Sequence, residues 1–125
     1  MNKKLAIFLS LMILAIISVG VVCAGDNDTV KLNGFNFTIP EGFSVNNTTN
    51  DHVTLLNDNG DMIKIKVEMS LNDKLNVFGD SSSLGSKEGV LRNYNNGNCS
   101  FFYLDDGHMI TITAPNQSLI ESVIS

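Results

Sequence analysis

The stretch from Ser100 to Ala114 constrains the fold more than any other part of this sequence. It reads Ser-Phe-Phe-Tyr-Leu-Asp-Asp-Gly-His-Met-Ile-Thr-Ile-Thr-Ala, with aromatic and β-branched residues on both sides of Asp105-Asp106-Gly107. The Asp-Gly pair supplies the positive φ angles that tight hairpin turns need. The sequence therefore predicts a β-hairpin that carries most of the apolar mass of the C-terminal half and on which the other elements pack.

The first 24 residues have the pattern of a targeting segment. Two lysines precede an uncharged apolar run, Leu5–Val22, and Val22-Cys23-Ala24 places modest or small side chains where signal peptidase reads. We therefore expect a signal peptide over residues 1–24 and a single small domain over residues 25–125. Because the run is close to the length of the shortest membrane-spanning helices, a retained N-terminal anchor is one alternative and a lipid-modified Cys23 is another.

The charge of residues 25–125 narrows the range of partners. Six basic side chains stand against thirteen acidic ones, a formal balance of −7. A nucleic-acid partner is not expected, because there is no basic patch to neutralise phosphates. An anionic lipid surface is disfavoured for the same reason, so membrane contact is expected only through residues 1–24, if they are retained.

Cysteine use argues against a scaffold held by disulfides. Cys99 is the only cysteine after cleavage of the expected signal peptide, and a lone cysteine makes no internal disulfide. It is predicted to be a small buried side chain in a strand, with an intermolecular disulfide as the alternative.

Apolar residues at every second position predict further strands. Val30–Ile39 alternates on both sides of Asn33-Gly34, which is read as a turn or bulge. His52–Met69 predicts a second hairpin, and a three-residue loop, Asp58-Asn59-Gly60, gathers its apolar side chains on one face. This register forms two apolar pairs, Leu55 with Ile63 and Val53 with Ile65.

Two segments have helical periodicity. In Ser70–Gly79 the apolar Leu71, Leu75 and Phe78 recur at i, i+4 and i+7, and a glycine ends the pattern. Asn116 can cap a final helix of about two turns. The inner face of this second helix is expected to hold Leu119, Ile120, Val123 and Ile124.

The remaining segments complete the expected fold. Ser44–Asp51 and Asp80–Lys87 are polar and are expected to be surface loops, whereas Glu88–Tyr94 is expected to be a weak strand. The patterns together predict an α+β fold, an antiparallel β-meander of about five to seven strands with a short C-terminal helix packed on one face. An N-terminal signal or hydrophobic helix precedes it. The expected core is Phe37, Phe43, Ile63, Ile65, Phe101, Ile110, Ile112 and Ile120.

Six Asn-x-Ser/Thr sequons mark candidate glycan acceptors, which in an exported chain lie at the surface. They are Asn27, Asn36, Asn46, Asn47, Asn98 and Asn116. A chain this rich in Asn, Ser and Thr also forms sequons by chance. Only one or two are therefore expected to be used, chiefly those in Ser44–Asp51.

No residue set has a catalytic, metal-binding or cofactor-binding pattern, and no cofactor is predicted. His52 and His108 are the only histidines. His108 lies beside the turn of the central hairpin, so a small hydrolase that uses His108 with Asp105 or Asp106 is the catalytic alternative. An exposed turn residue is the simpler interpretation of each histidine.

Several stretches resemble one known pattern. Asn33–Phe43 is similar to the N-G-x-x-F-x-I-P-x-G-aromatic opening of small exported proteins from methanogenic archaea, and Gly85–Leu91 and Leu104–Pro115, with the following Leu-Ile-x-x-Val-Ile helix, resemble the rest. The resemblance implies an exported α+β domain and assigns no catalytic or ligand residues. The aromatic residue after Pro-x-Gly also resembles PsbP-like and Mog1-like α/β sandwiches, which bind partners rather than catalyse.

The first hypothesis for function is a secreted or cell-surface domain, without catalytic activity, that contacts a protein or a glycan of the cell envelope. It rests on the export signal, the acidic surface rich in sequons and the lack of a catalytic residue set. The alternatives are the small hydrolase and a structural envelope component held in the membrane by Leu5–Val22.

Overall fold

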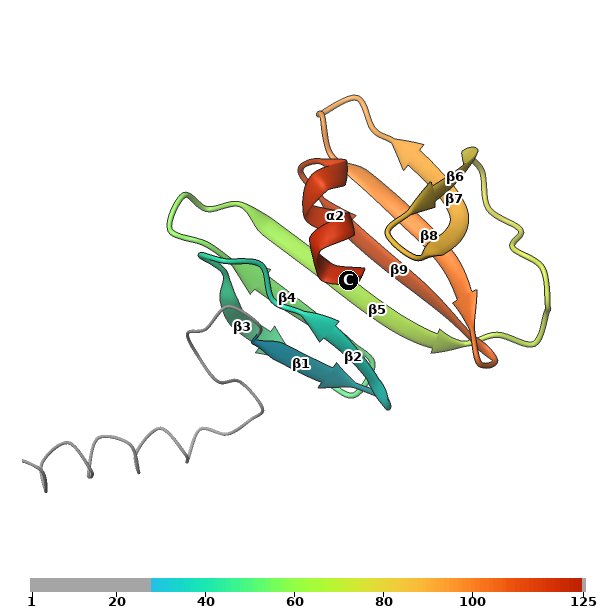
Figure 1. Cartoon of the computed structure of the whole chain (residues 1–125), viewed down its shortest axis with the longest axis horizontal. Helices are drawn as coiled ribbons and strands as arrows, with labels where there is room; N and C mark the ends of the chain where they lie inside the picture. The colour runs from blue at the N-terminus through green and yellow to red at the C-terminus, as the bar shows by residue number, and fades with distance from the viewer. Residues whose placement is uncertain (1–27, 125) are drawn as a thin grey trace, which may run out of the picture.

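A computed structural model describes residues 28–124 of the chain. The predicted signal segment, residues 1–24, lies outside the described residues. Within them the chain forms a seven-stranded antiparallel sheet, a separate two-stranded sheet and one short C-terminal helix, α2 (Figure 1). The elements are β1 (Thr29–Leu32), β2 (Phe35–Thr38), β3 (Ser44–Thr48), β4 (His52–Leu56), β5 (Met62–Met69), β6 (Asp80–Leu84), β7 (Lys87–Asn93), β8 (Cys99–Asp105), β9 (His108–Ala114) and α2 (Gln117–Ile124).

The helix α2 and the β1–β2 hairpin both pack on one face of the larger sheet, which we call the inner face (Figure 1). A single hydrophobic core fills the space between them. The sheet contributes apolar side chains from β4, β5, β8 and β9, and the covering layer contributes those of β1, β2 and α2. A half-buried sheet with one covered face is what period-two alternation produces.

The β8–β9 hairpin is confirmed at the centre of the fold. Asp105 pairs with His108, so the turn consists of Asp106 and Gly107, whose φ angles are 48° and 77°. Inner-face residues of this hairpin are fully buried, among them Phe101, Ile110 and Ile112. The turn chemistry and the alternation therefore agree, which is why this element was predictable.

The predicted register of the β4–β5 hairpin is also confirmed. Val53 pairs with Ile65 and Leu55 pairs with Ile63. The Asn57 N–H donates to the Asp61 carbonyl at 3.2 Å and closes the three-residue loop. Gly60 has a φ of 88°, the left-handed conformation expected for it.

The predicted simple meander is wrong in its connectivity. The strand order is β3-β4-β5-β9-β8-β7-β6, so β5 is joined to β9 and not to β6, the next strand in sequence. Two meanders, β3–β5 and β6–β9, therefore meet at the β5–β9 pair. This pairing sets Ile65 opposite Ile112 and Val67 opposite Ile110, which joins two apolar faces into one core.

Three local predictions are also wrong. The expected loops at Ser44–Asp51 and Asp80–Lys87 contain the edge strands β3 and β6, and the expected helix at Ser70–Gly79 is irregular. An edge strand pairs on one side only and here is mostly exposed, so its sequence needs no apolar alternation. The helical pattern of Ser70–Gly79 finds no apolar surface to pack on, and so short a helix needs one.

The C-terminal helix is confirmed. The Leu119 N–H donates to Asn116 Oδ1 at 2.9 Å, the N-cap bond, and α2 buries Ile120 and Val123. Of the eight expected core residues, seven are buried and Phe43 is half-buried. No helix in residues 28–124 has both the length and the apolar character to span a membrane.

A candidate binding surface on the open face of the sheet

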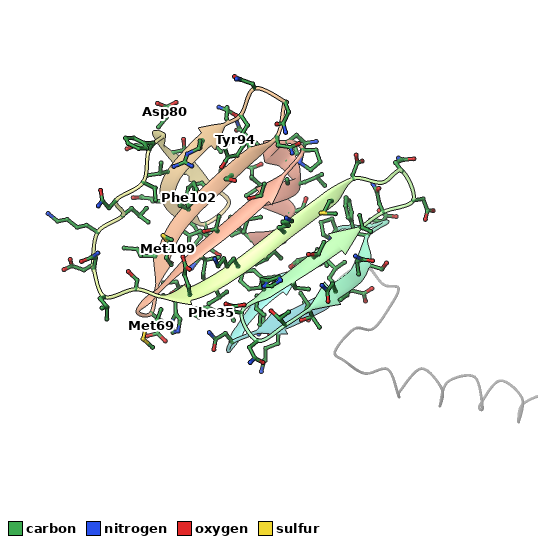
Figure 2. The ribbon with its side chains drawn as sticks, turned by 180° about the vertical axis from the view of Figure 1, so that it is seen from behind. Phe35, Met69, Asp80, Tyr94, Phe102 and Met109 are labelled. Carbon is green, nitrogen blue, oxygen red and sulfur yellow. The ribbon has the colours of Figure 1, made fainter. Side chains whose placement is uncertain are left out.

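The face of the larger sheet that points away from α2 is covered by no described helix or strand (Figure 2). We call it the open face. Cross-strand pairing aligns its side chains in two rows that run across the strands. The first row is Thr54, Lys64, Thr113, Ser100 and Arg92. The second row is His52, Lys66, Thr111, Phe102 and Val90.

A chain of hydroxyl groups crosses the first row. Ser100 Oγ lies 2.6 Å from Thr113 Oγ1, and the Tyr94 hydroxyl donates to Ser100 Oγ at 3.1 Å. Ser100 is only 2% exposed, so these bonds satisfy a polar group that burial would otherwise destabilise. They also fix the position of the Tyr94 ring, which is 38% exposed at the end of β7.

Arg92 is held in place from three sides. Its Cζ lies 5.1 Å from the ring centroid of Phe102 and 6.0 Å from that of Tyr94. Its Nε–H donates to the Phe78 carbonyl at 3.1 Å. Both aromatic contacts are within the range of cation–π attraction. These three contacts restrict the position and orientation of the guanidinium before any ligand arrives.

The donors of Arg92 are mostly unused. A guanidinium has five N–H groups, and within residues 28–124 only the Nε–H of Arg92 has a hydrogen-bond partner. Neither Arg92 nor Lys64 forms a salt bridge in the described part of the chain, whereas Lys66 lies 3.5 Å from Glu68. Two unpaired cations on one face stand out in a protein whose net charge is strongly negative.

The sequence analysis missed Arg92, Tyr94 and Ser100. Their signal is the alternation of Val90, Arg92 and Tyr94, which places the three side chains on one side of an extended chain. Which face of the sheet these side chains occupy follows only from the pairing of Arg92 with Ser100, because the sequence does not determine the register of β7.

His108 and its neighbouring carboxylates do not form the pair that the hydrolase alternative requires. The His108 Nδ1 lies 2.9 Å from the Asp106 carbonyl oxygen, a main-chain atom, and the ring packs edge-on against Phe35 at 5.3 Å. The Asp105 carboxylate is bound instead to Lys87 Nζ at 3.0 Å. The contacts of these residues therefore stabilise the conformation of the turn.

His52 lies in a second polar cluster, which closes the β3–β4 turn. Its Nδ1 is 2.9 Å from Thr49 Oγ1 and 3.1 Å from Asp51 Oδ1. Hydrogen bonds from His52 and then from Thr49 lower the pKa of the Asp51 carboxyl. In a catalytic series of nucleophile, histidine and carboxylate, the nucleophile and the carboxylate bond to different nitrogens of the imidazole. Here both partners share one nitrogen, so the cluster is a turn and not a catalytic series.

The described residues show no grouping of three or more His, Cys, Asp or Glu side chains that could hold a metal ion. Cys99 is 2% exposed, as predicted for a buried strand cysteine, and burial raises the pKa of its thiol. A thiol in this environment is protonated and inaccessible, so it is a poor nucleophile.

The sequons lie on different elements. Asn36 is exposed on β2, and Asn46 and Asn47 are exposed on the edge strand β3. Asn98 is half-buried in the β7–β8 turn, and Asn116 is exposed at the start of α2. Asn27 lies outside the described residues. Occupancy of these sites stays a prediction.

A scan against protein-family models, a search of curated proteins and a search of solved structures each gave no match to this chain.

Proposed function

We propose that this protein is an exported domain that acts by binding, not by catalysis, and that its open face recognises a carboxylate-bearing glycan of the cell envelope. The observation that carries the proposal is the geometry of Arg92. Its guanidinium is fixed by Phe102, Tyr94 and the Phe78 carbonyl, and its Nη donors are free among the described residues. A planar fork of this kind suits two-pronged binding of a carboxylate.

The surroundings of Arg92 favour a sugar as the carrier of that carboxylate. The exposed Tyr94 ring offers an apolar face with a polar edge, on which the C–H face of a sugar ring can lie. Half-buried Thr111 and Thr113 line the same face. Hydroxyl groups beside an aromatic ring match the mixed polarity of a saccharide.

The spacing of the cations favours a polymer with repeated charges. Lys64 and Arg92 lie three strands apart in the order β5-β9-β8-β7, which corresponds to roughly 14 Å at the usual strand separation. A single carboxylate cannot reach both. The acidic character of the whole chain disfavours non-specific attraction of anions, so binding here depends on the local arrangement.

The direct test is a titration of the purified protein with polygalacturonate, a polyuronate, and with dextran, a neutral glucan. We expect binding to polygalacturonate only, weakening as salt is added. Arg92→Gln should weaken it about tenfold or more, and Arg92→Lys should recover only part of the loss because Lys lacks the planar fork. Lys31→Gln is the matched control, since it removes one exposed cation from β1, outside the open face.

Several results would overturn the proposal. These are equal binding of dextran and polygalacturonate, binding of neither, or equal loss in Arg92→Gln and Lys31→Gln. A thermal melt of Arg92→Gln is needed beside the titration, because this side chain also covers Phe102.

Export is the second part of the proposal and rests on residues 1–24. The intact mass of the protein from the medium and from the membranes of its host tests it. A chain that begins at Gly25 in the medium supports secretion, and any excess mass counts the glycans. A chain that keeps Met1, or that carries a lipid on Cys23, in the membrane fraction favours the anchored alternative. The hydrolase alternative has less support, because Asp105 is bound to Lys87 and His108 to a main-chain oxygen.

A further inference from the structure

The segment between β5 and β6, residues 70–79, exposes more apolar surface than any other part of the described chain. Leu71 is 94% exposed and Phe78 is 85% exposed, and Met69 just before them is 73% exposed. With ten residues it is also the longest connection between described elements. Figure 1 shows it standing away from the sheet as it crosses from the end of β5 to β6. Long connections without secondary structure are commonly functional.

The segment is hydrogen-bonded to the rest of the fold at its two ends, and between them Leu75 and Val77 are half-buried. The Ser70 N–H donates to the Gly107 carbonyl at 2.9 Å, and Arg92 Nε–H donates to the Phe78 carbonyl at 3.1 Å. No main-chain hydrogen bond to another main-chain group involves residues 71–77 within the described chain. Its backbone groups are therefore available for another conformation.

The sequence of the segment encodes a helix. The Asn72 N–H already donates to Ser70 Oγ at 3.3 Å, the bond of an N-cap residue. Leu71, Leu75 and Phe78 share one face at helical spacing, and Gly79 follows as a stop. Eight residues are too few to stay helical without a surface to pack on. Start signal, apolar stripe and stop are thus all present, and only the packing surface is missing.

The anchors leave room for this helix. Asp80 pairs with Leu91, which pairs with Phe101, so the first residue of β6 lies roughly 15 to 20 Å from Gly107, given the rise along β8 and the strand spacing. A helix over residues 71–78 is about 12 Å long, and two extended residues add up to about 7 Å. The change from irregular chain to helix therefore needs no movement of the sheet.

We propose that residues 70–79 are a docking segment that becomes helical when it binds a second protein, and that Leu71, Leu75 and Phe78 fill an apolar groove on that protein. Amphipathic helices bind grooves through anchors at this spacing. Three carboxylates line the shallow groove beside the segment: Asp73, Asp106 and Asp105, of which Asp105 is paired with Lys87. The segment itself carries one cation, Lys74, so the balance of these groups is acidic. Charge complementarity therefore calls for a partner whose groove has a basic rim.

The same charges argue against two other occupants. An anionic lipid surface would be repelled by this acidic border. A second copy of the chain would set one acidic border against another, because a symmetric contact pairs like surfaces. The inference is argued from exposure and helical pattern, and it shares one contact with the proposed glycan site, the bond from Arg92 Nε to the Phe78 carbonyl.

The experiment has two steps. A photo-crosslinking residue is placed at position 71 in the full chain in its host, and at Asn59, an exposed residue of the β4–β5 turn, as the control. The protein captured at position 71 and not at position 59 is then purified, and its affinity is measured for the wild type and for two variants, Asn76→Pro and Asn76→Ala. Asn76 is exposed and lies off the apolar stripe, in the interior of the expected helix.

The two variants separate a helix from an extended chain. Proline inside the helix should weaken binding about a hundredfold or more, and alanine should leave it equal or slightly tighter. Thermal melts and polygalacturonate binding should be unchanged in both variants, because the free segment is not helical. Equal affinity of Asn76→Pro and wild type would overturn the proposal. So would capture of another copy of this chain, binding to anionic phospholipid vesicles, or equal capture at positions 71 and 59.

Discussion

The β8–β9 hairpin and the β5–β6 segment are both rich in large apolar residues, but these residues differ in how far the fold buries them. The hairpin buries Phe101, Ile110 and Ile112 completely, whereas the segment leaves Leu71 and Phe78 almost fully exposed. The hairpin has period-two alternation and a paired strand on each side. The segment has helical period, but Leu71 and Phe78 are left without a covering surface. Apolar content alone does not decide burial, because the period must match a neighbour that can receive the side chains.

The difference has an energetic meaning. Complete burial of a Leu or Phe side chain stabilises a fold by about 1.5 to 3 kcal/mol. The hairpin gains this stabilisation at several positions, and the segment gains almost none of it at Leu71 and Phe78. The exposure of Leu71 and Phe78 is therefore not explained by the stability of the fold, and the proposed partner would supply the explanation.

The largest effect on the free energy of unfolding is expected from the buried residues of the β8–β9 hairpin. Ile112→Ala should lower the free energy of unfolding by about 2 to 5 kcal/mol, because it removes a fully buried side chain and leaves a cavity. Urea denaturation followed by circular dichroism measures the change. Thr111→Ala, the half-buried neighbour on the open face, is the control and should cost much less. Similar losses in the two variants would mean that the hairpin does not form the centre of the core.

An intermediate effect is expected from Tyr103, a hairpin residue that is 3% exposed. Burial, and then the negative charge of Asp105, raise the pKa of its phenol. The folded protein thus keeps a proton that the unfolded chain loses from about pH 10 upward. Its contribution to stability is complete below that pH and falls above it, by up to about 1.4 kcal/mol per pH unit.

Tyr103→Phe tests this contribution, because phenylalanine has no proton to lose. Urea midpoints of the wild type and the variant, measured between pH 7 and pH 11, should run parallel below about pH 10. Above it the wild type should lose stability faster than the variant, while the titration of the other groups is common to both. Parallel curves over the whole range would show that the phenol is accessible to water in the folded protein.

The comparison also explains how much the sequence could predict. The β4–β5 hairpin with its Asn-Gly turn and register, the β8–β9 hairpin with its Asp-Gly turn and the cap of α2 were predictable, because local turn chemistry and period agree at each. The edge strands β3 and β6 were not, since Ser and Asn side chains carry no period on a strand with one partner. Nor was the β5–β9 pair, which joins residues far apart in the chain.

The candidate site was less predictable than the fold. Arg92, Tyr94 and Phe102 meet only because β7 pairs with β8 in one particular register. The residues that sequence reasoning singled out, His108 and the neighbouring Asp105, instead stabilise a turn. A histidine beside acidic residues is visible in any sequence, whereas a guanidinium placed by two aromatic rings exists only in three dimensions.

The smallest effect on the free energy of unfolding is expected from the exposed residues of the β5–β6 segment. Leu71→Ser and Phe78→Ser should each change the free energy of unfolding by less than about 0.5 kcal/mol, the usual range for surface substitutions. Urea denaturation of each variant beside Ile112→Ala measures this difference. A loss of more than about 1 kcal/mol in either variant would show burial against the sheet in solution. The segment would then be part of the core, its apolar residues would need no partner, and the docking inference would fail with it. An unchanged free energy of unfolding would mean that neither Leu71 nor Phe78 stabilises the folded chain.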